Sequence, residues 1–182
     1  MKFVSAGHNT GGLKPDPGAI GVNGRKEAVE TISFRNLVIS EFKRLNVTDY
    51  ITDNDNERLG EYLERIKTGN GSVVLEFHFD AGPATATGTT VFIEEDADRL
   101  DKAFANQLAK ATSEILGIKD RGVRSEIESH RGKLGLMREQ GIVALLEICF
   151  ISNVQDMQLY DANKTKLAIK IAELIIEFDK YI

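Results

Sequence analysis

The sequence predicts an α/β domain with a largely parallel central sheet and helices on both faces. Short apolar runs alternate along the chain with stretches in which apolar residues recur at helical spacing, which is the pattern of this fold class. The strongest run, IVALLEICF at residues 142–150, is typical of a strand buried on both faces. With 182 residues, 42% of them apolar, the chain can bury one core of ordinary size, so we expect residues 1–182 to form a single domain.

The first half of the chain begins with an apolar strand at residues 2–6. Gly, Pro and Asp dominate residues 9–23, which predicts a loop, and the apolar spacing of residues 26–45 predicts a helix after it. Residues 56–67 have the composition of a surface helix. The segment SVVLEFHF at residues 72–79 is apolar and β-branched enough for a central buried strand.

The second half continues the alternation of strand and helix. Residues 89–93 are expected to form a strand, and residues 98–116 a helix that Gly117 can cap. The run at residues 142–150 follows as the last strand, and apolar residues on one helical face predict a final helix at residues 164–181.

The composition argues against several classes of partner. A net charge of −5 without any run of Lys or Arg argues against nucleic acid and anionic membranes. Cys149 is the one cysteine, so no internal disulfide is possible. Residues 1–7 hold too short an apolar stretch for a signal peptide, and no other segment is apolar enough to span a membrane. We therefore expect a soluble chain without an export signal.

Three polar residues stand at comparable places in the predicted strands. His8 follows the first strand, His78 lies near the end of a central strand, and Glu147 interrupts the last, where an unpartnered carboxylate is costly to bury. Each alone is compatible with a structural hydrogen bond or ion pair. Together they indicate one site, because ligand sites in open α/β sheets form beyond the carboxyl ends of the strands. Zinc favours imidazole and carboxylate, and a hydrolytic zinc needs three protein ligands plus a water, so we expect a zinc site there.

The third zinc ligand remains open at this point. Glu27 and Glu30 both lie in the first helical turns after the glycine-rich loop. Glu76 shares a strand face with His78 and Asp80 by the two-residue alternation. Spacing does not choose among these carboxylates.

Six segments, in this order, carry a resemblance that covers nearly the whole chain: SAGHNTGGLKPDPGAIGVNGRKE, VVLEFHFDAG, TGTTVFI, DRGVR, LGLMRE and LLEICFISN. Together they resemble the zinc-dependent N-acetylmuramoyl-L-alanine amidases of type 3. The resemblance implies zinc-dependent hydrolysis of the amide bond between N-acetylmuramic acid and L-alanine, with peptidoglycan as the partner.

The resemblance also assigns the site residues. The family's GxxE element maps onto GRKE, so Glu27 is expected to bind Zn²⁺ with His8 and His78, and Glu30 becomes an ordinary helix residue. The family's catalytic Glu maps onto Glu147, which would act as general base towards the water and then protonate the leaving nitrogen.

The chain departs from the family pattern at three positions. Asp80 stands where Asn is usual, Glu76 where a small polar residue is common, and Cys149 where Gly is frequent. Glu76 and Asp80 could orient a ligand histidine through its second nitrogen. Cys149 shares a strand face with Glu147 and could lie near the metal, although a small buried side chain is the simpler interpretation.

Substrate contacts are expected from the DRGVR segment, which the family carries near its groove. Arg121 and Arg124 could hold stem-peptide carboxylates, because guanidinium matches carboxylate geometry, and a solvated surface pair is the alternative. Asp80 is a third candidate for substrate binding. His130 lies in a polar stretch without strand-end placement, so we interpret it as a surface residue.

The resemblance has further implications for regulation and origin. The segment at residues 122–141 is too short for the inhibitory helix of some relatives, so we expect an open groove. A phage or prophage endolysin, monomeric and cytoplasmic until it is released to the wall, fits the absence of a leader. A secreted or periplasmic housekeeping amidase without its leader is the competitor. A zinc peptidase and an inactive wall-binding module are the other classes, and a binding module would need no general base.

Overall fold

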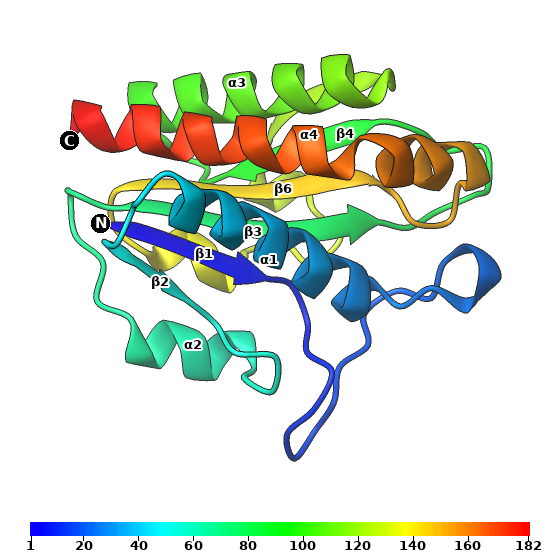
Figure 1. Ribbon diagram of the computed structural model, residues 1–182, viewed down its shortest axis with the longest axis horizontal. Helices are drawn as coiled ribbons and strands as arrows, with labels where there is room; N and C mark the ends of the chain where they lie inside the picture. The colour runs from blue at the N-terminus through cyan, green and yellow to red at the C-terminus, as the bar shows by residue number, and fades with distance from the viewer.

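A computed structural model describes residues 1–182 and shows a six-stranded sheet with helices packed against it (Figure 1). The strands are β1 (Lys2–Ala6), β2 (Tyr50–Thr52), β3 (Val73–Asp80), β4 (Thr89–Ile93), β5 (Asp120–Ser125) and β6 (Ile142–Phe150). The α-helices are α1 (Glu27–Arg44), α2 (Leu59–Arg65), α3 (Arg99–Leu116) and α4 (Val154–Phe178). The order across the sheet is β2-β1-β3-β6-β4-β5.

The sheet is mixed but mostly parallel. Strands β2, β1, β3 and β6 run in one direction, whereas β4 is antiparallel to β6 and β5 is parallel to β4. The predicted α/β class with a largely parallel sheet is therefore confirmed. Because β4 is reversed, its first residues lie beside the carboxyl-terminal half of β6, and Thr90 pairs with Glu147.

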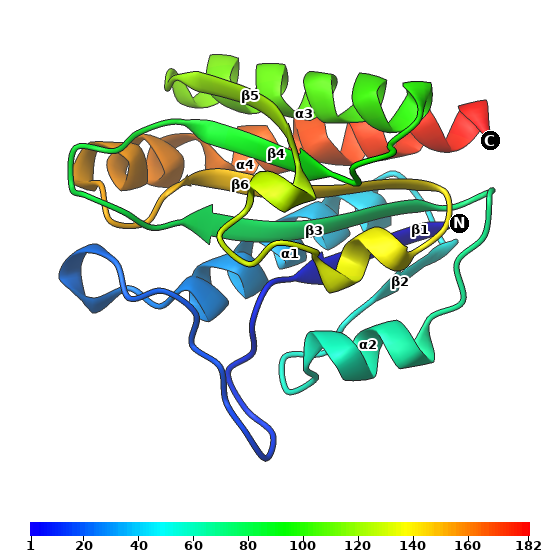
Figure 2. The same ribbon diagram turned by 180° about the vertical axis from the view of Figure 1, so that it is seen from behind.

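The two faces of the sheet are covered unequally. Helices α1, α3 and α4 pack on one face around a core of 33 buried residues, while the opposite face has α2 and a cluster of nine. Figure 2, seen from behind, shows β3, β4 and β6 in front of the three long helices. Helices thus cover both faces, as expected, but the face with α2 has less cover and leaves room for a cleft.

Two strands and the bounds of two helices differ from the sequence-based expectations. The edge strands β2 and β5 were not expected: one has three residues and the other, DRGVRS, is polar. Helix α4 begins at Val154 rather than at residue 164, because Asn153 caps it by accepting from the backbone amides of Gln155 and Asp156. Helix α2 is shorter than residues 56–67. None of the helices is long and apolar enough to cross a membrane.

The parallel strands bring the predicted site residues to the same end of the sheet. β1 pairs with β3 up to Ala6 and Phe77, so His8 and His78 both follow the last paired positions. β3 pairs with β6 so that His78 lies directly beside Glu147. These residues therefore meet at the carboxyl-terminal ends of β1, β3 and β6.

Candidate metal centre

Glu27 is the first residue of α1, and its carboxylate lies buried at the end of the sheet. Its side chain is 5% exposed. Oε2 accepts a hydrogen bond of 2.9 Å from the amide of Ala19, and Oε1 accepts one of 3.1 Å from the amide of Phe79. The glycine-rich loop and the end of β3 therefore both hold this carboxylate in place.

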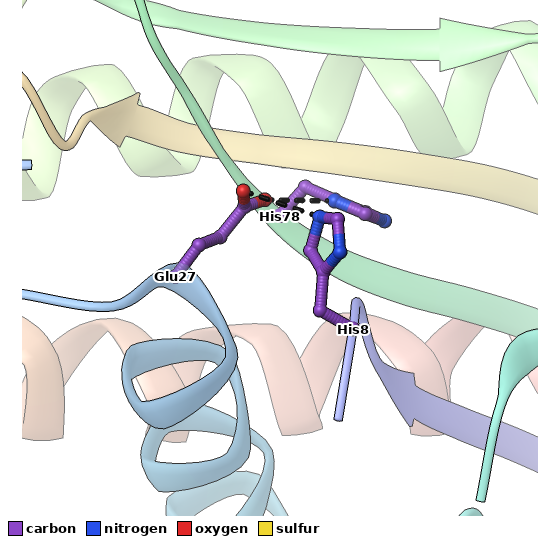
Figure 3. Close-up of side chains that lie close together, drawn as sticks. All are labelled: His8, Glu27 and His78. Atoms are coloured by element: carbon purple, nitrogen blue, oxygen red, sulfur yellow. Dashed lines mark hydrogen bonds and ion pairs between the residues drawn. The ribbon is translucent and has the colours of Figure 1, made fainter. Parts of the chain in front are cut away.

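His8 and His78 each direct one ring nitrogen towards the same carboxylate, as Figure 3 shows. His8 Nε2 lies 3.2 Å from Glu27 Oε2, and His78 Nδ1 lies 2.9 Å from Glu27 Oε1. One ligand atom from each of the three residues lies within 4.8 Å of the others. Two imidazole nitrogens and a carboxylate oxygen at this spacing are a donor set that suits zinc with an open fourth position.

The second nitrogen of each histidine is held by another carboxylate. His8 Nδ1 lies 2.8 Å from Asp16 Oδ2, and His78 Nε2 lies 3.0 Å from Glu76 Oε1. Carboxylate partners on the outer nitrogen are characteristic of metal-binding histidines, because they fix the ring orientation. This pattern is a second, independent feature that fits a metal ion.

Without a metal, these contacts shift the pKa values of the cluster. Burial opposes ionisation of Glu27, but the bonds to His78 and His8 outweigh it and lower the pKa of its carboxyl. Burial also disfavours the charged form of His78 and so acts to lower its pKa. The hydrogen bonds to Glu27 and Glu76 outweigh this effect and raise that pKa. The metal-free cluster therefore favours an ionised Glu27 beside a protonated His78.

Two glycines are required where the backbone approaches these side chains. A Cβ on Gly7 would lie 2.3 Å from the ring of His78. A Cβ on Gly18, whose φ of +64° is also unfavourable for other residues, would lie 2.6 Å from Glu27 Oε2. The glycine-rich loop is therefore needed for close packing around the cluster.

A buried ion pair supports the backbone that leads into His8. Asp53 Oδ1 accepts a hydrogen bond of 3.1 Å from the amide of Ala6, and Arg35 lies 2.8 Å from Oδ2 of the same carboxylate. Thr31 of α1 donates a hydrogen bond of 2.7 Å to the carbonyl of Gly7. These contacts fix the two residues before His8 from both sides.

Glu147 lies next to the cluster without joining it. Its Oε2 is buried and has no hydrogen-bond partner. Burial raises the pKa of this carboxyl to about 8, against a lowering effect from His78. A buried, unpaired carboxyl beside three metal-type donors is a candidate for proton transfer.

An open cleft of about 1160 Å³ gives access to the cluster and to Glu147. The predicted substrate residues Arg121, Arg124 and Asp80 line it together with the His–Glu–His cluster. His130, which the sequence indicated as a surface residue, is exposed but also lines this cleft. Its polar, irregular segment gave no signal of this placement.

The three substrate candidates have different surroundings. Arg121 packs over the ring of Phe150 at 5.0 Å, and its buried Nε has no partner. Asp80 Oδ1 accepts a hydrogen bond of 2.8 Å from the amide of Ala81, and burial raises the pKa of Asp80 although Arg121 acts in the opposite direction. Arg124 is half-buried at the cleft. The cleft lining therefore includes two arginines and one carboxylate.

The remaining sequence candidates lie elsewhere. Glu30 Oε2 forms an ion pair of 2.8 Å with Arg25 and does not line the cleft. Cys149 lies in the apolar core, with its Sγ 3.8 Å from Met157 Sδ. The small buried side chain is therefore the interpretation that the structure supports for Cys149.

Comparisons with known proteins find similarity along nearly the whole chain. The family model of N-acetylmuramoyl-L-alanine amidase (Amidase_3) matches residues 3–177. No curated protein matches the sequence. The fold is similar to that of several solved structures at identities that establish the fold alone.

Three of these structures show how far the similarity extends. The catalytic domain of the endolysin CD27L, which targets Clostridia Difficile, is 17% identical, with 97% of this chain and 96% of that one covered and a TM-score of 0.73. The amidase AmiC2 of Nostoc punctiforme is 20% identical, with 98% and 96% covered and a TM-score of 0.75. The catalytic domain of the amidase CwlV of Bacillus (Paenibacillus) polymyxa is 23% identical, with 98% of both chains covered and a TM-score of 0.73.

The raised pKa of Glu147 predicts how the stability of the metal-free protein depends on pH. Unfolding returns this pKa from about 8 to its ordinary value of 4.5, so the stability it contributes is complete below pH 4.5 and is lost as the pH rises through 8. Glu147→Gln removes this titration. In chelator-treated samples the variant should melt within about a degree of the native protein at pH 4 and several degrees above it at pH 9. The same difference in Tm at both pH values would contradict the prediction.

Proposed function

This chain belongs to the N-acetylmuramoyl-L-alanine amidase family, and we propose that it hydrolyses the amide bond between N-acetylmuramic acid and L-alanine in peptidoglycan. The observation that carries the proposal is the cluster of His8, Glu27 and His78 beside the unpaired carboxyl of Glu147, all lining an open cleft. A hydrolytic metal site needs this combination of ligands and base.

We assign zinc to His8 Nε2, Glu27 and His78 Nδ1. Two neutral imidazoles and one carboxylate match zinc chemistry, and the carboxylate partners on both outer nitrogens support the assignment. When bound, zinc supplies Lewis-acid polarisation of the scissile carbonyl and acidifies a water molecule for attack near neutral pH.

Glu147 acts as the general base in this proposal. Its pKa falls beside a divalent cation, because positive charge favours the ionised carboxylate. The carboxylate then accepts a proton from the attacking water and delivers it to the nitrogen of L-alanine as the amide bond breaks. Its lack of a competing hydrogen bond at Oε2 leaves this oxygen available for the transfer.

Arg121 and Arg124 hold the stem peptide from one side of the cleft. Both residues line the cleft, and the peptide stem offers carboxylates that match the planar donors of guanidinium. Asp80 lines the same cleft, near enough to both arginines for their charges to lower the pKa of its carboxyl against the effect of burial.

The activity itself can be tested on purified cell walls. Zinc-loaded protein should release stem peptides that begin with L-alanine, leaving glycan strands with free muramic acid carboxyl groups, as read by mass spectrometry. Chelator should stop the release, and added zinc should restore it. Cleavage between amino acids of the stem would indicate a zinc peptidase, and wall binding without any release would indicate a binding module; either result contradicts the proposal.

The ligand assignment predicts which carboxylate of α1 retains the metal. Glu27→Gln and His78→Ala should each reduce zinc content well below the one ion per chain of a mononuclear hydrolase, because each removes a direct ligand. Glu30→Gln is the matched control, since Glu30 lies in the same helix but pairs with Arg25, and it should keep the full content. Elemental analysis measures the result. Zinc kept by Glu27→Gln and lost by Glu30→Gln would reassign the third ligand.

The base assignment predicts loss of activity without loss of metal. Glu147→Gln should slow wall lysis by about 10²- to 10⁴-fold, because glutamine has a similar volume but cannot accept the proton. Its zinc content should equal that of the native protein. Near-native lysis would show that another group is the base, and lost zinc would show that Glu147 is a ligand.

A further inference from the structure

Glu76 is a buried carboxylate of β3 that takes no part in the proposed reaction. Its side chain is 2% exposed. Ser5 of β1, its neighbour in the strand register, donates a hydrogen bond of 3.2 Å to Oε2, and His78 Nε2 lies 3.0 Å from Oε1. A carboxylate removed from water to this degree is stable only where such partners compensate its charge.

The position of Glu76 determines which nitrogen of His78 faces the metal centre. An ionised carboxylate can only accept hydrogen bonds, so Nε2 carries a hydrogen where it meets Glu76. In the neutral ring the free lone pair is then on Nδ1, the nitrogen that faces Glu27 at 2.9 Å. Gly7 closes over the ring, where even an added Cβ would lie 2.3 Å away, and so opposes a ring flip.

The two histidines turn different ring nitrogens towards Glu27, and their outer nitrogens lie in different surroundings. His8 directs Nε2 inward, and its outer nitrogen contacts Asp16, whose side chain is 56% exposed. His78 directs Nδ1 inward, and its outer nitrogen contacts the buried Glu76. A charge acts more strongly where water is excluded. The carboxylate of Glu76 therefore has a larger effect on His78 than the carboxylate of Asp16 has on His8.

We propose that Glu76 is a positioning residue of the metal centre, whose buried carboxylate holds His78 Nε2–H so that Nδ1 is the zinc-binding nitrogen. The same hydrogen bond makes His78 a stronger ligand and raises the affinity for zinc. The inference rests on the proposed function only for the presence of a metal. It concerns affinity and ring orientation, and these are measured without substrate.

The variant Glu76→Gln isolates the charge, because an amide can keep both the contact to Ser5 and the contact to His78. Competition with a fluorescent chelator should show a Kd for zinc raised roughly 10- to 100-fold, at a retained stoichiometry of about one. Glu64→Gln is the matched control: it removes the same charge from the exposed rim of the same cleft and should change the Kd by less than about threefold. An unchanged Kd for Glu76→Gln, or an equal effect of Glu64→Gln, would overturn the proposal.

Nuclear magnetic resonance of the native protein tests the ring orientation without any variant. Long-range ¹H–¹⁵N spectra of the zinc-loaded protein should show His78 with a protonated Nε2 and a metal-bound Nδ1. A metal-bound Nε2 would overturn the proposal, even if Glu76→Gln failed to fold. Complete loss of zinc by a folded Glu76→Gln would also overturn it, because Glu76 would then be a ligand. Failure of wall hydrolysis with these results intact would instead count against the proposed function.

Discussion

The carboxylate of Glu27 is the point at which the separate parts of the site meet. It accepts hydrogen bonds from the amides of Ala19 and Phe79 and faces one ring nitrogen each of His8 and His78. A charge this deeply buried requires such partners, and as the first residue of α1 it also lies at the positive end of the helix dipole. The loop after β1, the end of β3 and the start of α1 are thereby tied to one group, so the position of each depends on the others.

The fold was predictable where burial gives a clear sequence pattern. Strands covered on both faces, such as β3 and β6, are continuous apolar runs, and the helix at residues 98–116 has a cap at Gly117 that the structure shows with φ of +70°. The edge strands β2 and β5 carry no such pattern, since none of their residues is fully buried. The first turns of α4 were missed because half of the residues in their sequence, VQDMQLYDAN, are polar.

The site was predictable to the extent that strand geometry controls it. His8, His78 and Glu147 follow or interrupt strands that share an edge, so their meeting follows from a parallel sheet. The choice between Glu27 and Glu30 depends on how α1 is rotated about its axis, which residue spacing does not encode; only the family resemblance selected Glu27. His130 reaches the cleft from the connection between β5 and β6, a tertiary placement without a local signal.

The alternation of side chains along β3 and β6 explains why the site residues and the cleft lie on the same face of the sheet. Val74, Glu76 and His78 point to one face of β3, and Glu147 stands beside His78 in the register, so its side chain points the same way. Val74 belongs to the small apolar cluster beneath α2, which places the polar residues beyond it on the less covered face. On the other face, three long helices would exclude a polymeric substrate. The helix arrangement therefore determines from which side a substrate reaches the metal centre, and the two-residue period of the strands places the ligand, its positioning carboxylate and the base on that side.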